Sequence, residues 1–253
     1  MTTKTATPVS DAGSQYRFQH LRTGLILGDM RFGSDDPKPG DAVPEFDLPT
    51  VDGGRFQSGD LSQNGPALLV FGSLSCPVTD DSAPGFRELH AKYGNDVWFV
   101  FVNVREGHPG QALPQPQSAD EKMKHAKLLR EFYGFDFEVA VDDADGSLHR
   151  ALSPKPNSAY LLGQDGTILY RAHWANDTNW IGQALAAVIA GDPLRKTEGW
   201  GMMRAMMPVM AHIGPTLDRA GGGAWCDLWV AMPPLAMMAR VMKLMRLRAS
   251  GAK

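Results

Sequence analysis

Two short runs of consecutive apolar residues set the strongest limit on how this chain can fold. Residues 67–72 (ALLVFG) and 97–104 (VWFVFVNV) lack an alternation of polar and apolar side chains, as expected for strands buried on both faces. The segment between them predicts a helix that begins near Pro77, because proline is well tolerated in a first helical turn. Strand, helix and strand in this order form a βαβ unit, so the sequence predicts an α/β fold with a mostly parallel or mixed sheet.

Helices and strands continue to alternate after this unit. A helix is predicted after Ser118, which forms a capping box with Glu121. Its buried face is predicted to contain Met123, Ala126, Leu129 and Phe132. The remaining predicted elements are a strand at 137–141, a helical turn at 147–152, a hairpin of 159–162 with 167–170, and a helix at 178–190 that ends at Gly191.

Charge and methionine content separate the C-terminal part of the chain from the rest. Residues 202–253 carry seven basic and two acidic residues and ten of the thirteen methionines, whereas the remaining residues have a net charge of −8. The spacing of the methionines at 202, 203, 206, 207 and 210 is helical, which usually means core packing and sometimes an adaptable binding surface. We predict an N-terminal extension at 1–39, an α/β domain at 40–192 and a basic, Met-rich helical extension at 193–253.

The composition excludes several classes of protein. With 43% hydrophobic residues, 21% charged residues and a net charge of −3, the chain of 253 residues can bury a core and is not a general nucleic-acid binder. Two cysteines cannot form a four-cysteine zinc site or a disulfide scaffold, and we expect neither a metal nor a bound cofactor. The start of the chain does not match a signal peptide, and the apolar stretch 224–245 contains charges and prolines. We therefore expect a cytoplasmic protein that does not cross a membrane.

Cys76 lies where the first predicted strand meets the predicted helix. The free amides and the dipole of a helix N-terminus stabilise a thiolate, which is the nucleophilic form of cysteine. Ser73, Ser75 and Thr79 supply hydroxyl groups nearby, whereas Asp80 in the first turn would repel a thiolate. A buried, inert thiol is the common alternative. The position after a strand and before a proline favours a reactive thiolate with a lowered pKa.

The segments 71–73 (FGS), 76–77 (CP) and 106–109 (EGHP), together with the predicted hairpin, resemble the thioredoxin fold. More specifically, they resemble the iodothyronine deiodinases and their bacterial redoxin-like relatives. The resemblance covers residues 40–190 and implies a central mixed sheet flanked by helices. It implies an oxidoreductase activity as well. The matching segments, in order and at similar spacings, are 71–73 (FGS), 76–77 (CP), Pro84, 106–109 (EGHP), 140–142 (AVD), 156–160 (PNSAY) and 166–170 (GTILY).

The resemblance implies roles for three residues. Cys76 takes the place of the deiodinase selenocysteine, and Glu106 and His108 take the places of active-site residues. A protonated His108 would stabilise a thiolate and could donate a proton to a leaving group, although a solvated loop histidine is the alternative. We expect His149 to be a surface residue.

Three features differ from the family pattern. Cysteine is a poorer leaving group than selenocysteine, which counts against efficient deiodination. Ser158 stands where deiodinases and peroxiredoxins carry an arginine, and Thr79 replaces the second cysteine of the thioredoxin C-x-x-C motif. A one-site disulfide exchange is excluded, because no local thiol can resolve the mixed disulfide. Pro156 and Ser158 are predicted to lie in the substrate cleft. Pro156 or Pro154 is the candidate for a cis proline that shapes this cleft, an ordinary trans proline being the alternative.

The sequence thus predicts a thiol oxidoreductase with Cys76 as its single nucleophile. The thiol would attack an oxygen, sulfur or halogen atom of a small substrate, and an external thiol or a thioredoxin-type reductant would regenerate it. A redox-inactive binding module with a thioredoxin-like fold is the competing hypothesis, and the pKa of the thiol separates the two.

The sequence does not determine what the C-terminal extension packs against. Cys226, between Trp225 and Asp227, is predicted to be buried, and nothing in the sequence specifies that the extension docks on the face that carries Cys76. The basic stretch from Arg240 favours packing on its own domain or on a second copy in a homodimer over contact with a membrane surface.

Overall fold

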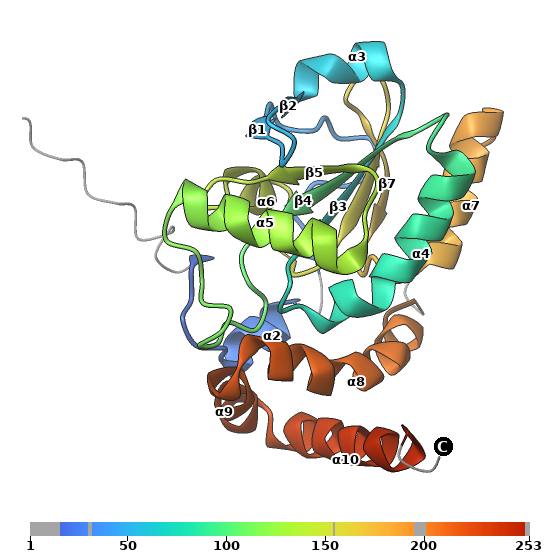
Figure 1. Ribbon diagram of the computed structural model, residues 1–253. Coiled ribbons are helices and arrows are strands. Elements are labelled where there is room, and N and C mark those ends of the chain that lie inside the picture. Colours follow the sequence, from blue (N-terminus) through green and yellow to red (C-terminus); the bar gives the residue numbers. More distant parts are fainter. Residues whose placement is uncertain (1–15, 30–31, 154, 195–200, 251–253) are drawn as a thin grey trace, which may run out of the picture.

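A five-stranded mixed sheet forms the centre of the molecule (Figure 1). The computed structural model describes residues 16–29, 32–153, 155–194 and 201–250. The strand order is β5-β4-β3-β6-β7, in which β3 pairs in parallel with β4 and antiparallel with β6. The predicted α/β class, the mixed sheet and the βαβ unit are confirmed. The strands are β3 (Ala67–Gly72), β4 (Trp98–Asn103), β5 (Glu138–Val141), β6 (Ala159–Leu162) and β7 (Ile168–Ala172).

Helices and a small hairpin cover the two faces of this sheet. Side chains alternate along β3, so Leu68 and Val70 enter one hydrophobic cluster while Leu69 and Phe71 enter another. The first cluster includes residues of α4, α5 and α7, and the second includes residues of the β1–β2 hairpin and α6. These elements are β1 (Asp47–Pro49), β2 (Arg55–Gln57), η1 (Ser58–Asp60), α3 (Leu61–Asn64), α4 (Pro77–Tyr93), α5 (Ala119–Tyr133), α6 (Ser147–Ala151) and α7 (Thr178–Ala190).

The segments at the two ends of the chain pack together below the sheet (Figure 1). α8 (Gly201–Ala220) lies against α4, and α9 (Gly222–Ala231) and α10 (Pro233–Ser250) pack on α8. α2 (Thr23–Asp29) lies beside them, because the Thr23 hydroxyl donates to the carbonyl of Ala231 (2.6 Å). None of the helices in the described residues is both long and apolar enough to span a membrane.

The face that α5 buries differs from the predicted one. The capping box exists in part: the Ser118 hydroxyl accepts a hydrogen bond from the Glu121 amide (3.2 Å). Phe132, however, is 57% exposed. Ala126 and Leu129 are buried as predicted, and Lys122 and Tyr133 complete the buried face. Lys122 belongs to it because its ammonium donates to the carbonyl of Asp143 (2.7 Å), a contact that an apolar pattern cannot reveal.

Candidate active site

Cys76 is the residue that precedes the first turn of α4, directly after the loop that leaves β3. Its amide donates to the Ser73 carbonyl (3.3 Å), and its carbonyl accepts from the Thr79 amide (3.0 Å). The position at a helix start, with Pro77 as the first helical residue, is therefore as predicted. The side chain is only 2% exposed.

Burial gives this thiol the opposite pKa shift to the one predicted. Desolvation raises the pKa of Cys76 to about 11, against hydrogen bonds from Thr79 and Val78 that lower it, and the charge of Asp80 adds to the increase. The thiolate loses its hydration, and this loss outweighs the stabilisation provided by the helix N-terminus. The expectation of a lowered pKa is thus wrong for this state of the protein, which holds the thiol form at neutral pH.

Glu106 fixes the loop before Cys76 and does so from a fully buried position. Its Oε2 atom accepts hydrogen bonds from the amide (2.9 Å) and the hydroxyl (2.6 Å) of Ser75. Its Oε1 atom accepts from Nδ1 of His125 at 2.7 Å. Glu106 therefore holds the active-site loop in place through Ser75. His125 was not predicted, since it lies on α5 and meets Glu106 only in the folded chain.

The segment 107–108 covers Cys76 from the side. The Gly107 amide donates to the Ser73 hydroxyl (3.1 Å), and the His108 amide donates to the Ser75 hydroxyl (3.1 Å). A β carbon on Gly107 would lie 3.4 Å from the β carbon of Cys76. The hydroxyl groups of Ser73 and Ser75 thus hold the 107–108 segment against the loop before Cys76, because they accept hydrogen bonds from its backbone amides.

His108 is half-buried, with Nδ1 of its ring shielded from solvent, and it is neutral. Desolvation lowers its pKa to about 4, although the charge of Asp227 acts in the opposite direction. Nδ1 of the ring has no hydrogen-bond partner within the described part of the protein. The predicted role of a resident imidazolium beside the thiol is therefore wrong. A neutral ring remains able to accept a proton.

Thr79 and Asn157 join the helix start to the sheet. The Thr79 hydroxyl oxygen accepts from the Ser73 amide (3.4 Å) and from the Asn157 side-chain amide (3.2 Å). The same amide group of Asn157 donates to the Phe71 carbonyl (2.8 Å). Gly72 is required here, since a β carbon would lie 2.5 Å from the Thr79 hydroxyl oxygen. Asn157 was also not predicted.

The two residues assigned to a substrate cleft have different surroundings. Ser158 is fully buried, its carbonyl accepts from the Phe71 amide (2.9 Å), and its hydroxyl has no partner within the described residues. No cis peptide bond occurs among the described residues, so Pro156 is a trans proline and the cis expectation for it is wrong. Pro154, the other candidate, lies outside the described residues.

His149 is buried, contrary to the prediction of a surface position. Its Nδ1 atom is 2.8 Å from the Tyr16 hydroxyl, and its Nε2 atom is 2.6 Å from the Lys155 carbonyl. Burial lowers its pKa well below the usual value. The signal that was missed is Asp142, whose carboxylate accepts from the His149 amide (2.9 Å) and directs this short helix inward.

Comparison with known proteins places this site in a family. Residues 39–171 match the model of the AhpC/TSA family, which is more than half of the chain. The chain belongs to the AhpC/TSA family. Membership places it among the thiol oxidoreductases in the general sense.

Individual relatives of this AhpC/TSA protein include the deiodinases that the motifs resemble. Thyroxine 5-deiodinase of Ovis aries is 26% identical over 117 residues, which cover 43% of this chain and 39% of that protein. The Homo sapiens enzyme is 28% identical over 145 residues, which cover 52% of this chain and 46% of that protein. The chain thus spans less than half the length of these relatives.

Solved structures show the same fold. A hypothetical protein from Sinorhizobium meliloti has a TM-score of 0.51 at 19% identity, over 65% of this chain and 91% of that one. An uncharacterized conserved protein from Geobacillus kaustophilus has a TM-score of 0.51 at 20% identity, over 65% and 88%. These likenesses concern the fold alone, which is thioredoxin-like.

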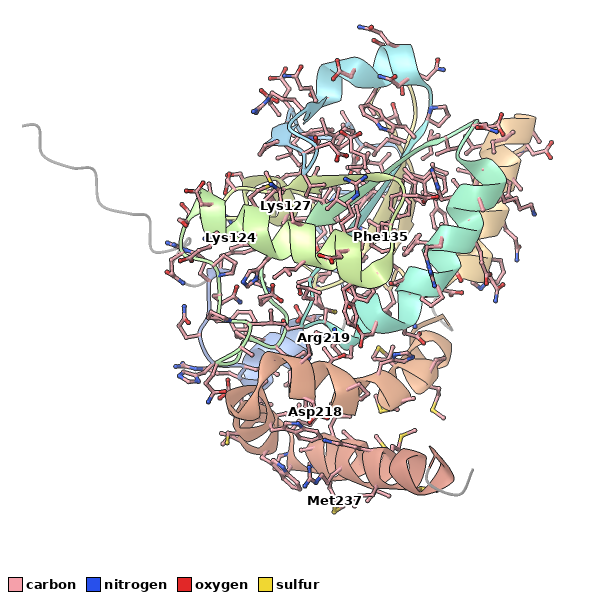
Figure 2. The ribbon with its side chains drawn as sticks, viewed as in Figure 1. Lys124, Lys127, Phe135, Asp218, Arg219 and Met237 are labelled. Atoms are coloured by element: carbon pink, nitrogen blue, oxygen red, sulfur yellow. The ribbon has the colours of Figure 1, made fainter. Side chains whose placement is uncertain are left out.

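A helix outside the AhpC/TSA match contributes to the site. Arg219, near the end of α8, donates to the carbonyl of Leu74 (2.7 Å) and to the carboxylate of Asp80. Figure 2 shows Arg219 on the side of α8 that faces the domain. The sequence did not specify this docking of the extension. It also predicted burial of Cys226, which is wrong, since that thiol is exposed.

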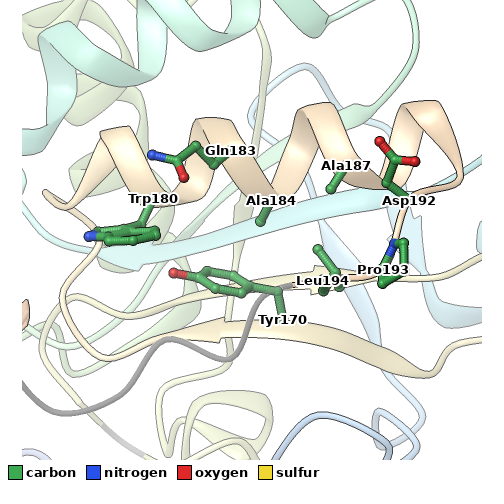
Figure 3. Close-up of a pocket in the computed structure, with 8 residues that line it drawn as sticks. All are labelled: Tyr170, Trp180, Gln183, Ala184, Ala187, Asp192, Pro193 and Leu194. Carbon is green, nitrogen blue, oxygen red and sulfur yellow. The ribbon is translucent and has the colours of Figure 1, made fainter.

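Two of the cavities formed by the described residues lie beside the AhpC/TSA domain. One of about 380 Å³ lies between α4, the end of α5 and α8, and includes Asp80, Phe132, Tyr133 and Arg219 in its lining. A smaller one of about 180 Å³ lies between β7 and α7 (Figure 3), and no residue of the Cys76 site lines it. The first is therefore the cavity that adjoins the helix carrying Cys76.

Proposed function

We propose that the protein reduces a small electrophilic substrate with Cys76 as its single nucleophile. The thiol loses a proton, and the sulfur attacks an oxygen of a peroxide, a sulfur of a disulfide or a halogen of a halogenated aromatic compound. With a peroxide the O–O bond breaks, giving a cysteine sulfenic acid and, after proton uptake, an alcohol or water. Two equivalents of an external thiol then restore Cys76 and leave as a disulfide, with release of water.

The observation that carries this proposal is the position of Cys76 at the junction of β3 and α4, with a rigid loop on each side. Two buried hydrogen bonds join Ser75 to Glu106, and two partly buried ones join the backbone amides of residues 107 and 108 to Ser73 and Ser75. Such a framework holds a reacting sulfur in one orientation, which supports a chemical role rather than simple core packing. Thr79 replaces a local resolving cysteine, which supports the need for an external reductant.

His108 is a neutral hydrogen-bonding group in this proposal, and not the base that deprotonates the thiol. Its pKa of about 4 leaves the ring unprotonated at neutral pH, but it also makes the ring too weak a base to remove the proton of a thiol with a pKa of about 11, so that proton leaves to solvent. The backbone bond from His108 to the Ser75 hydroxyl keeps the ring on the segment that covers Cys76.

The test is a comparison of substrate classes. Hydrogen peroxide, a low-molecular-weight disulfide and a halogenated phenol are each supplied with excess thiol, and turnover is followed for the wild type and for Cys76→Ser. We expect turnover of at least one class, and its loss in Cys76→Ser. Cys226→Ala is the matched control and keeps its turnover. Turnover that survives in Cys76→Ser contradicts the proposal.

A redox-inactive binding module is the second candidate, and the burial of the thiol favours it. Cys76 is 2% exposed, and its pKa is raised to about 11, as expected of a structural cysteine. This candidate predicts no turnover with any of the three substrate classes. It also predicts that Cys76→Ser and the wild type give the same result in all three turnover assays.

A further inference from the structure

Arg219 contacts the chain on both sides of Cys76. Its Nη1 atom donates to the carbonyl of Leu74 at 2.7 Å, two residues before the cysteine. Nη1 and Nη2 also donate to the two carboxylate oxygens of Asp80, at 2.8 and 2.9 Å, in the first turn of α4. One guanidinium therefore joins the loop that precedes Cys76 to the helix that follows it. Residue 219 lies outside the part of the chain that matches the family.

The carboxylate of Asp80 is nearly buried, and it accepts hydrogen bonds from several donors. Its side chain is 7% exposed. Besides Arg219, the Tyr133 hydroxyl donates to Oδ1, and the Thr216 hydroxyl donates to Oδ2 at 2.8 Å. Among these partners Arg219 alone carries a charge opposite to that of Asp80. Without the guanidinium, a nearly buried negative charge would remain close to Cys76.

The other polar groups around Cys76 do not neutralise the negative charge of Asp80. Glu106 is committed to Ser75 and His125, and the Tyr133 phenol stays protonated because burial raises its pKa far above the usual value. His108 is neutral at physiological pH. Asp80 and Tyr133 are the titratable groups that interact electrostatically with Cys76 among the described residues, and Arg219 is the cation that binds Asp80.

α8 holds the covering segment too. The Ala112 amide donates to the carbonyl of Ala220 at 2.9 Å, and a β carbon on Gly110 would lie 2.3 Å from that same carbonyl oxygen. The end of α8 therefore lies against the loop that continues from His108, one residue after Arg219.

We propose that Arg219 is a positioning residue for Cys76: it clamps the loop before the cysteine to the first turn of α4 and neutralises Asp80. The extension is then part of the active site and not only an appendage. This inference rests on the proposed function, in which a thiolate must form at Cys76. The guanidinium acts through Leu74 and Asp80 and does not itself touch the sulfur.

The test measures thiol reactivity and not turnover, so that it stands apart from the substrate question. In a Cys226→Ala background, the second-order rate constant of alkylation by iodoacetamide is measured from pH 7 to pH 10. The variants are Arg219→Met, Asp80→Asn and the double variant. Arg240→Met, on the exposed side of the same extension, is the matched control.

Arg219→Met is expected to lower the rate constant about fivefold at each pH, because an uncompensated Asp80 disfavours the thiolate. The double variant is expected to return to within about twofold of the parent, since the unpaired charge is then gone. Arg240→Met should match the parent.

Three outcomes overturn the inference. One is an unchanged rate constant in Arg219→Met, and another is a double variant that stays as slow as Arg219→Met. The third is faster alkylation in Arg219→Met, which would show that the helix shields the thiol rather than supporting it. Arg219→Lys keeps the charge and guards against a folding defect: its rate constant should lie between those of the parent and Arg219→Met.

Discussion

Cys76 is buried and His108 is half-buried, and both side chains are driven to their neutral forms. Burial raises the pKa of the thiol to about 11 and lowers the pKa of the imidazole to about 4. At neutral pH neither side chain carries a charge, so the two do not form a thiolate–imidazolium pair. A thiolate forms there only at the expense of desolvation, and its concentration depends on pH over an unusually high range.

The first prediction follows for the wild-type thiol. In the Cys226→Ala background, the alkylation rate of Cys76 should rise about tenfold per pH unit beyond pH 8.5, the usual pKa of cysteine. The physical reason is that the thiolate fraction keeps increasing towards the raised pKa. Stopped-flow or quenched alkylation between pH 7 and pH 10 measures this slope. A plateau below about pH 8.5 would restore the sequence-based expectation of an activated thiolate.

The second prediction concerns stability in acid. His108 has a folded-state pKa of about 4, below the usual value of 6.5, so the unfolded chain binds more protons between these values. Its contribution to the unfolding free energy is complete above pH 6.5 and decreases as the pH falls to about 4. The decrease is about 3 kcal/mol between pH 7 and pH 4. Denaturant unfolding of His108→Gln should show a shallower loss of stability over this range.

His20→Gln is the control for that experiment. The imidazole of His20 is 75% exposed and lies 3.0 Å from a carboxylate oxygen of Asp227, so its removal reports on a solvent-exposed histidine under the same conditions. His149 is also buried with a lowered pKa, so part of the acid loss will persist in His108→Gln. Identical pH profiles for His108→Gln and the wild type would place the His108 ring in water.

At the scale of elements, the loops around Cys76 are held by polar groups that come from distant parts of the sequence. The apolar runs of β3 and β4 and the turn signals of the β6–β7 hairpin were sufficient to predict these elements, because each is a local pattern of side chains. His125 and Asn157 were missed because their partners lie 19 and 78 residues away, and no local spacing encodes such pairs. The predicted buried face of α5 left out Lys122, because a lysine in a sequence is normally expected to be exposed to solvent.

The third prediction addresses the buried carboxylate that joins these elements. Glu106→Gln replaces one of the two acceptor oxygens with an NH₂ group, which leaves either Ser75 or His125 without its acceptor. Loss of a charge-assisted buried hydrogen bond should lower the unfolding free energy by about 2 kcal/mol. Denaturant unfolding at neutral pH measures it. Glu88→Gln, at an exposed position of α4, is the control.

The same variants report on the chemistry. Because Glu106 holds Ser75, and Ser75 holds the His108 amide, Glu106→Gln should also change the alkylation rate of Cys76, whereas Glu88→Gln should not. A Glu106→Gln protein as stable as the wild type would show that this carboxylate is not the anchor of the loop.

At the scale of the whole molecule, the C-terminal extension and the rest of the chain, which pack together, carry opposite net charges. The extension after Met202 is basic, and the remainder carries a net charge of −8. The composition predicted a helical extension, and α8, α9 and α10 confirm it, with α10 packed on its own chain. Its docking was not predictable, because Arg219 and Asp80 are 139 residues apart and each resembles an ordinary surface charge.

The outer surface of α10 remains without a partner among the described residues. Ala236 and Ala239 face inward, whereas Met237, Val241 and Leu244 are 59%, 50% and 52% exposed. Figure 2 shows Met237 on the side of α10 that points away from the domain. The homodimer and the membrane-surface contact stay predictions for this face.

The last prediction is that Cys226 does not resolve an oxidised Cys76. A disulfide requires the two α carbons to come within roughly 7 Å, with β carbons directed at each other. Cys76 is buried under the 107–108 segment, whereas Cys226 is exposed on α9, so one of the two would have to leave its position. A sulfenic acid at Cys76 should therefore persist until an external thiol reduces it.

Limiting hydrogen peroxide, followed by disulfide mapping with mass spectrometry, measures this outcome. We expect Cys76 as a sulfenic acid that a dimedone probe traps, with the same yield in the wild type and in Cys226→Ala. A linkage between two Cys226 residues leaves the prediction intact, because that thiol is exposed and Cys76 takes no part. An abundant linkage from Cys76 to Cys226, within one chain or between two, contradicts it, since α9 would then have to leave its place and act as the resolving element.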